Sequence, residues 1–366
     1  METKVLNIIS NGLKREGITS TQIEYMKYID KTNLQIDIAA VHNDEPEVVK
    51  TFEKLGCRVI HFPDRYGNLA KYLWSLYKVI RKEKYDVVHV HGSSSLLAIE
   101  LFVAKVAGVK IRIAHSRNTQ CKHKVFDRLL RPFFYSTYNI ALACGDEAGE
   151  FLFADRQYIT LHNGKDFDKF AFSNEIRNDI RKRMNLEDKL AIGFVGSLNE
   201  QKNPFFLIDI FAEIKPRMEN AHLIIMGDGP KRKAVEEYVV QKGIFEDVTF
   251  MGRIINVNEV IQGMDVMLLP SLYEGLPNVV LEWQISGLVS LVSDKVTKEC
   301  KVSELVKFLP IDDGTEVWIN EIMTIGVQTD RVKRSEVARQ EMKKAGYEIK
   351  ESAARLRDIY INGVVS

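Results

Sequence analysis

Two glutamates, Glu274 and Glu282, lie in a segment that follows the apolar run Val266–Leu269. Gly275 and Pro277 stand between them. A glycine lets the backbone approach a ligand closely, and a proline suits the first turn of a helix because its missing N–H has no helical partner there. The segment therefore predicts a strand-to-helix loop whose backbone N–H groups point at an anion, such as a phosphate.

The two carboxylates of this segment would repel a phosphate placed beside them. Glu274 and Glu282 therefore fit such a loop only if they accept hydrogen bonds from hydroxyl groups, as on a ribose and a sugar. The spacing also allows a plainer interpretation, in which Glu274 caps the helix and Glu282 lies on its solvated face.

Two further loops have a similar form. The segment 196–204 follows the apolar run 191–195, starts with Gly196 and ends with a proline. Its Lys202 can reach a phosphate, although a surface lysine explains it equally well. Gly227 opens a third turn after an apolar run, and this turn would lie beside the first two loops at the predicted ligand site. The sequence contains neither the G-x-G-x-x-G dinucleotide fingerprint nor a P-loop motif.

Two histidines of the first half lie at the expected ends of strands. His91 follows the apolar run 87–90, and His115 follows the run 111–114. A histidine at the carboxyl end of a strand can donate a hydrogen bond or stabilise developing charge, although a lone histidine is more often structural. The candidates for binding a substrate in this half are Gly12, Gly17, His91 and Arg117.

Short apolar runs alternate with amphipathic stretches along the whole chain. Runs of four to six apolar residues suit strands buried on both faces, and their alternation with helices implies parallel sheets with right-handed crossovers. The sequence therefore predicts an α/β protein with two doubly wound, Rossmann-like domains, 1–170 and 171–346, that face each other across a cleft. The predicted strands are 5–9, 36–41, 59–62, 87–90, 111–114 and 140–143, then 191–195, 223–226, 248–250, 266–269 and 289–292.

An amphipathic helical region occupies residues 335–362, and Gly346 is expected to interrupt it. Its last part, 347–366, can pack on its own domain or return to the first one. The periodicity of apolar residues does not choose between these two arrangements.

The composition excludes several classes of protein. The chain has 366 residues, which predicts about two domains. Its 51 Lys and Arg nearly balance its 50 Asp and Glu, which argues against a nucleic-acid binder with a strongly basic surface. Its four cysteines lack zinc-site spacing, so reduced thiols and no metal site are expected. No apolar run approaches the ~20 residues of a membrane span.

The segment 196–288 resembles the nucleotide-sugar-dependent glycosyltransferases of the GT-B fold, specifically the retaining class often called family 4 or group 1. Glu274 and Glu282 match the E-x7-E motif of this class. Other matching motifs appear in the usual order of the family, and the resemblance is weaker over the first domain. These motifs are His162-Asn163-Gly164, Gly227-Asp228-Gly229-Pro230, Phe250-Met251-Gly252 and Asp265-Val266.

The resemblance implies a role for each matching residue. Glu282 would bind the ribose of the nucleotide and Glu274 the donor sugar, while Lys202 would contact the diphosphate. Glu274, His115 and Lys202 form the catalytic set, and no metal cofactor is implied. The donor is expected to be a UDP-, GDP- or ADP-sugar, with UDP favoured. The nucleotide-sugar-binding set is Glu282, Gly275, Leu276, Pro277, Gly196, Ser197, Lys202, Arg253, Gly227 and Ser271.

The chain departs from the family pattern at Ser197, where many members place an arginine that contacts the diphosphate. Arg253 is a candidate substitute for that arginine. The loop after the first strand also lacks the Gly-Gly pair that is frequent in the family. The serine at position 197 bears on the affinity for the donor, and the missing Gly-Gly pair bears on the role of the first loop in the acceptor site.

The segment Lys122–Tyr138 mixes basic and aromatic residues. Such a helix can lie on the anionic inner leaflet of a membrane, or it can pack in the core with a solvated basic face. The resemblance implies a cytoplasmic, retaining glycosyltransferase that uses a saccharide or lipid-linked acceptor in exopolysaccharide, capsule or other cell-surface glycan synthesis. The alternatives are a sugar-nucleotide epimerase or hydrolase of the same fold, and a non-catalytic two-domain sugar-binding protein.

Overall fold

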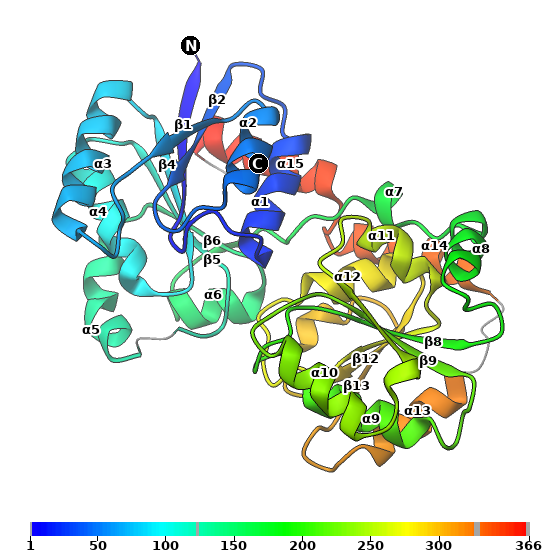
Figure 1. The fold of residues 1–366 in the computed structure, drawn as a ribbon. Coiled ribbons are helices and arrows are strands. Elements are labelled where there is room, and N and C mark those ends of the chain that lie inside the picture. Colours follow the sequence, from blue (N-terminus) through cyan, green and yellow to red (C-terminus); the bar gives the residue numbers. More distant parts are fainter. Residues whose placement is uncertain (1, 122–123, 326–329, 364–366) are drawn as a thin grey trace. The chain divides into compact units, whose positions relative to one another are not determined.

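The computed structural model describes residues 2–121, 124–325 and 330–363. It divides the chain into two compact α/β units, which Figure 1 shows in sequence colours. The first unit comprises residues 1–165 and 346–366, and the second comprises residues 166–345. The domain ranges inferred from the sequence place the first division after residue 170 instead of after residue 165.

The first unit is built on a seven-stranded parallel sheet with the order β3-β2-β1-β4-β5-β6-β7. Its central strands are buried along most or all of their length, as their continuous apolar sequences predict. The strands are β1 (Thr3–Ile9), β2 (Leu34–Ala40), β3 (Arg58–His61), β4 (Val87–Gly92), β5 (Ile111–Ser116), β6 (Ile140–Ala143) and β7 (Ile159–Thr160).

Helices cover both faces of this sheet, and each face has its own hydrophobic cluster. One cluster joins the sheet to α1, α2 and α15, and the other joins it to α3, α4, α5 and α6. These helices are α1 (Gly17–Tyr28), α2 (Pro46–Lys54), α3 (Leu69–Glu83), α4 (Ala98–Val106), α5 (Lys124–Phe134), α6 (Asp146–Phe153) and α15 (Ile349–Asn362).

The C-terminal helix α15 belongs to the first unit, although the whole second unit precedes it in the sequence. Its apolar face, with Ile349, Leu356 and Tyr360, is fully or almost fully buried in the core beside β1 and α1. Gly346 has a φ of 81° and ends the preceding helix, because this backbone conformation is unfavourable for other residues.

The second unit contains a six-stranded parallel sheet with the order β10-β9-β8-β11-β12-β13. Its strands are β8 (Leu190–Val195), β9 (Ala221–Met226), β10 (Val248–Gly252), β11 (Val266–Leu269), β12 (Val289–Ser293) and β13 (Val306–Leu309). Its helices are α7 (Phe167–Phe170), α8 (Asn174–Arg183), α9 (Pro204–Ile214), α10 (Arg232–Gln241), α11 (Val257–Val260), α12 (Asn278–Ile285), α13 (Glu316–Ile325) and α14 (Arg331–Lys344).

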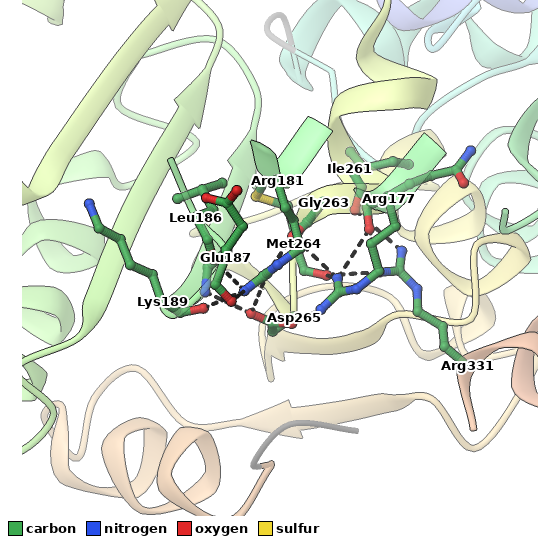
Figure 2. Close-up of polar contacts among 12 residues, drawn as sticks. Arg177, Arg181, Leu186, Glu187, Lys189, Ile261, Gly263, Met264, Asp265 and Arg331 are labelled. Carbon is green, nitrogen blue, oxygen red and sulfur yellow. Dashed lines mark hydrogen bonds and ion pairs between the residues drawn. The ribbon is translucent and has the colours of Figure 1, made fainter. Parts of the chain in front are cut away.

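A polar cluster lies at the amino end of β11, and Figure 2 shows its contacts. The Asp265 carboxylate accepts hydrogen bonds from Arg177 at 2.5 Å and from Arg181 at 3.0 Å. Arg331, from α14, donates to backbone carbonyl groups of the segment 261–264. One buried carboxylate therefore neutralises two arginines of α8, while a third arginine ties α14 to the turn before β11.

The predicted α/β architecture with two parallel sheets is confirmed. The structure contains all eleven predicted strands, and β11 has the predicted bounds. Two short strands, β7 and β13, escaped the sequence analysis.

Candidate functional site

In the second unit, β8 and β11 are neighbours in the sheet. The strand that follows β8 in the chain, β9, lies on one side of this pair, and the strand that follows β11, β12, lies on the other side. The loop after β8 leads through α9 to β9, and the loop after β11 leads through α12 to β12. Open parallel sheets bind their ligands at such a switch point, outside the carboxyl ends of the strands. The predicted donor-binding residues lie mainly in these two loops.

An ion pair joins the two loops. Lys202 Nζ donates to Glu274 Oε1 at 2.5 Å, and Ser271 Oγ donates to the same oxygen at 2.9 Å. The side chains of Lys202 and Glu274 are 16% and 10% exposed, so water screens their attraction only partly. The structure thus brings together three predicted site residues, and a diphosphate that bound Lys202 would compete with Glu274.

Gln201 holds the second oxygen of the Glu274 carboxylate. Its Nε2 donates to Glu274 Oε2 at 3.1 Å and to the Tyr273 carbonyl at 3.0 Å. The Leu272 N–H donates to the Gln201 carbonyl at 2.8 Å. These bonds fix the orientation of the carboxylate. Sequence analysis missed Gln201, because a loop glutamine has no distinguishing signal until its partner is known.

Close packing between two loops explains the glycines at their ends. A Cβ atom on Gly227 would lie 1.9 Å from the Gly196 carbonyl oxygen, and one on Gly229 would lie 2.5 Å from the Leu198 carbonyl oxygen. Gly227 also has a φ of 151°, which side chains disfavour. The backbone of segment 227–229 therefore packs directly against segment 196–198, and positions 227 and 229 have room only for glycine.

Arg253 does not join the Lys202 pair. It is exposed and follows β10, the edge strand, which lies two strands and about 10 Å from β8. Within the described residues, its side chain makes no hydrogen bond or ion pair. Ser197 is exposed at the loop after β8. The substitution of Arg253 for the family arginine at position 197 stays a prediction.

The second glutamate, Glu282, is half-buried in the second turn of α12. Pro277 directly precedes α12 instead of forming part of its first turn, since the Val280 N–H donates to the Pro277 carbonyl at 3.1 Å. Gly275 and Leu276 are half-buried in the loop before it. Their roles in binding the diphosphate stay predictions.

In the first unit, His91 and His115 are paired in register at the carboxyl ends of β4 and β5. His89 lies two residues before His91, so its side chain is on the same face of the sheet. All three imidazoles are fully buried, and the ring centroids of His89 and His91 are 3.9 Å apart. Sequence analysis missed His89, although the His-x-His alternation in a strand is a visible signal.

Burial holds the pKa of His89, His91 and His115 well below 6.5, and the nearby Arg117 charge lowers these pKa values further. The three rings are therefore neutral at pH 7. One ring nitrogen from each lies within 4.8 Å of the others, which is a spacing that a metal ion could use. The guanidinium of Arg117 contacts His91 and works against a cation at this place.

The other first-unit candidates have structural explanations. Gly12 has a φ of 84°, and a Cβ atom there would lie 1.8 Å from the His42 carbonyl oxygen, so the turn after β1 requires glycine. Gly17 is exposed at the start of α1. In the second unit, Asp166 and Asp168, which were not among the predicted site residues, have the spacing of a metal-binding D-x-D motif. Asp166 Oδ1 accepts a hydrogen bond from the Lys169 N–H at 3.0 Å and caps α7.

Comparison with known proteins decides the family. Residues 16–148 match the family described as Glycosyltransferase Family 4, and residues 189–322 match the one described as Glycosyl transferases group 1. EpsF of Bacillus subtilis (strain 168), named as a glycosyltransferase, is 30% identical over 374 residues, which cover 98% of this chain and 96% of EpsF. The chain is a family 4 glycosyltransferase.

Two other similarities extend over most of this glycosyltransferase. An Escherichia coli protein named UDP-Gal:alpha-D-GlcNAc-diphosphoundecaprenol alpha-1,3-galactosyltransferase is 28% identical over 315 residues, covering 81% of this chain and 80% of that protein. The crystal structure of Anabaena HepE in complex with UDP has a TM-score of 0.79 at 16% identity, covering 97% of this chain and 99% of HepE. The predicted GT-B fold and enzyme class are confirmed.

Among residues 2–121, 124–325 and 330–363, no helix of the glycosyltransferase is both long enough and apolar enough to cross a bilayer.

Proposed function

We propose that this glycosyltransferase transfers a sugar from a UDP-sugar to a lipid-linked or saccharide acceptor, with retention of configuration at the anomeric carbon, in the synthesis of a cell-surface polysaccharide. The observation that carries the proposal is the Lys202–Glu274 pair at the switch point of the second sheet. The name of the Escherichia coli relative supports both a UDP-sugar donor and a diphosphate-linked lipid acceptor.

The proposed step breaks the bond between the anomeric carbon and the UDP diphosphate on one face of the sugar. A new bond to an acceptor hydroxyl oxygen forms on the same face, and the proton of that hydroxyl passes to the leaving diphosphate. Lys202 exchanges Glu274 for the diphosphate and stabilises the charge that develops there, together with the N–H groups of Gly275 and Leu276. We propose that these groups suffice without a metal cofactor.

In this scheme the two carboxylates have separate tasks. Glu282, on α12, accepts hydrogen bonds from the ribose hydroxyls. Glu274, released from Lys202, accepts hydrogen bonds from hydroxyls of the donor sugar. His115, at the carboxyl end of β5, donates a hydrogen bond to a sugar hydroxyl. Glu282 should therefore determine nucleotide affinity, and Glu274 should determine turnover.

Replacing Glu282 by alanine should weaken UDP binding by about 1–3 kcal/mol, because the ribose hydroxyls lose their charged acceptor. Isothermal titration calorimetry with UDP and GDP measures this effect. Glu237→Ala, on the exposed surface of α10, is the matched control and should bind UDP as the wild type does. Unchanged UDP and GDP affinity in Glu282→Ala would contradict the assignment. Mass spectrometry of the products with and without an acceptor distinguishes transfer from release of free sugar.

We further propose that the protein works on the cytoplasmic side of the membrane and binds the anionic inner leaflet through α4 and α5. Phe126 and Leu129 of α5 are 64% and 72% exposed. Phe133 of α5 contacts Phe102 of α4 with ring centroids 5.2 Å apart, and both rings belong to exposed residues. The exposed Arg128 adds positive charge to this face.

Part of the predicted membrane segment has other contacts. Phe134 is fully buried, and Arg131 of α5 donates to the Phe151 carbonyl of α6 at 2.8 Å, so the inner side of α5 packs against its own unit. Lys122 and His123 lie outside the described residues. The surface available to a membrane is therefore the outer side of α5 with the adjoining part of α4.

The double change Phe126→Ser and Leu129→Ser should leave the protein in the supernatant under conditions in which the wild type sediments with anionic vesicles at low salt. The lost apolar contacts remove the anchoring that complements charge attraction. Val240→Ser, at a 60% exposed site on α10, should sediment like the wild type. Failure of the wild type to sediment with such vesicles would refute membrane binding.

A further inference from the structure

The outer side of α3 carries a tryptophan among lysines. Lys71, Trp74, Lys78 and Lys82 are all exposed, and their spacing of three or four residues places them on one side of the helix. We call these four residues the α3 stripe. The buried residues of α3 lie on the opposite side and pack in the hydrophobic cluster of that sheet face. The packing of the first unit therefore makes no use of the α3 stripe.

The positive charge of the α3 stripe has no carboxylate to balance it. The acidic residue of α3, Glu83, pairs with Arg58 of β3 at 3.0 Å. Within residues 2–121, 124–325 and 330–363, no carboxylate lies within ion-pair distance of Lys71, Lys78 or Lys82. The α3 stripe therefore presents an unneutralised cationic surface, which attracts an anionic partner.

Trp74 forms an exposed aromatic surface beside these charges. It is 58% exposed, and Tyr77 stacks on it with ring centroids 5.8 Å apart and an interplanar angle of 13°. Lys78 Nζ lies 5.0 Å from the centroid of the Trp74 ring. An indole has an apolar body and one N–H donor, so it suits the boundary between lipid headgroups and acyl chains, where tryptophan and tyrosine are enriched.

The α3 stripe continues the apolar surface of α4 and α5. α3 packs against α4, and α4 packs against α5, on the same face of the first sheet (Figure 1). Arg81 Nη1 donates to the Ala107 carbonyl, directly after α4, at 3.3 Å. Trp74 lies seven residues before Arg81. Phe102 lies five residues before Ala107. Because crossover helices of a parallel sheet run in the same direction, the two exposed rings lie within about one helical turn of each other along the helix axes.

The composition of the α3 stripe favours a membrane over a protein partner. Three of its four residues are lysines. Lysine is depleted in protein interfaces, because its flexible, strongly hydrated ammonium is costly to order and to desolvate. On a bilayer, a lysine keeps its ammonium among hydrated headgroups while its methylene groups lie along apolar surface.

We propose that α3 is a second membrane contact, in which Trp74 lies at the level of the headgroups and the lysines of the α3 stripe attract anionic lipids. The inference rests on the membrane binding proposed above for α4 and α5, and it extends that surface by one helix. A contact through α5 and the adjoining part of α4 leaves the first unit free to tilt. A further contact at α3, on the other side of α4, fixes the orientation of this unit on the bilayer.

The fluorescence of Trp74 reports the proposed contact, because the other two tryptophans, Trp283 and Trp318, are fully buried in the second unit. The full-length protein is mixed at low salt with vesicles of phosphatidylcholine and phosphatidylglycerol in equal parts, whose acyl chains carry bromine near the headgroup end. Bromine quenches only an indole that touches the bilayer. The emission of the wild type should fall and move to shorter wavelength, whereas the emission of Trp74→Phe should stay unchanged.

The role of charge is tested by the double change Lys71→Gln and Lys78→Gln, which retains Trp74. Its partition coefficient onto the same vesicles at low salt should be at least tenfold lower than that of the wild type, because each lysine near an anionic surface strengthens binding. The matched control is Lys50→Gln with Lys54→Gln. It removes two exposed charges from α2, on the opposite face of the sheet, and should bind as the wild type does.

Three results would overturn the inference while leaving membrane binding by α4 and α5 or the transfer reaction in place. Sedimentation of the wild type without quenching of Trp74 would confine the contact to α4 and α5. Equal partition coefficients for the two double variants would show that the lysines of α3 play no part. A shift of Trp74 emission by soluble dextran sulfate, without quenching by the vesicles, would assign the α3 stripe to a soluble polyanion.

Failure of the wild type to bind the vesicles at all would refute the contacts at α3, α4 and α5 together. The proposed transfer reaction fails on a different measurement, namely the absence of UDP binding that depends on Glu282.

Discussion

Replacement of Glu274 by alanine should lower turnover by about 100- to 1,000-fold, while UDP affinity stays the same or rises. The carboxylate is expected to hold the donor sugar in its reactive orientation, so its loss should slow the chemical step of sugar transfer. Its removal also frees Lys202, whose ammonium is bound to Glu274 at 2.5 Å in this structure. The freed ammonium can meet the diphosphate without competition.

Steady-state rates with a UDP-sugar and titration with UDP measure the two effects. Glu200→Ala is the matched control, because Glu200 lies in the same loop as Lys202 and pairs with Lys231 but is 74% exposed. That variant should keep both turnover and affinity near wild-type values. Wild-type turnover in Glu274→Ala would remove this carboxylate from the reaction.

The second large effect is expected for Asp265→Ala. Loss of the carboxylate leaves Arg177 and Arg181 without their opposite charge, and it removes an acceptor from the Ala191 N–H at 2.8 Å. Breaking such a buried pair costs about 3–5 kcal/mol of the free energy of unfolding. The effect should be confined to the second unit.

Urea denaturation followed by tryptophan fluorescence measures this change, because Trp283 and Trp318 are fully buried in the second unit. The control is Asp179→Ala, which removes an exposed ion pair with Arg183 on α8. It should cost no more than about 1 kcal/mol. If both variants lost equal stability, the Asp265 cluster would have no special role in the fold.

The sequence was most informative where local patterns decide structure. The run Val266–Leu269 became β11 with its predicted bounds, because four apolar residues between polar turns have few alternatives. β7 has only two residues. β13 lies at the sheet edge, and its exposed Lys307 interrupts the apolar run. Neither strand presents the continuous apolar signal on which the prediction depended.

The candidate site was predictable in its residue types but not in its contacts. Lys202 and Glu274 are 72 residues apart, and their pairing depends on β8 and β11 becoming neighbours in the sheet. The contact of His89 with Tyr360 spans 271 residues. Contacts over such distances follow from the order of strands, which no local pattern of one sequence specifies.

The return of α15 to the first unit has a consequence for synthesis on the ribosome. Residues 166–345 form a continuous unit that can fold as soon as it has emerged. Most of the first unit emerges earlier, yet its core lacks Ile349, Leu356 and Tyr360 until the segment after residue 345 is translated. The order of completed folding is therefore the reverse of the order of translation, and the nascent first unit exposes apolar surface that chaperones can recognise.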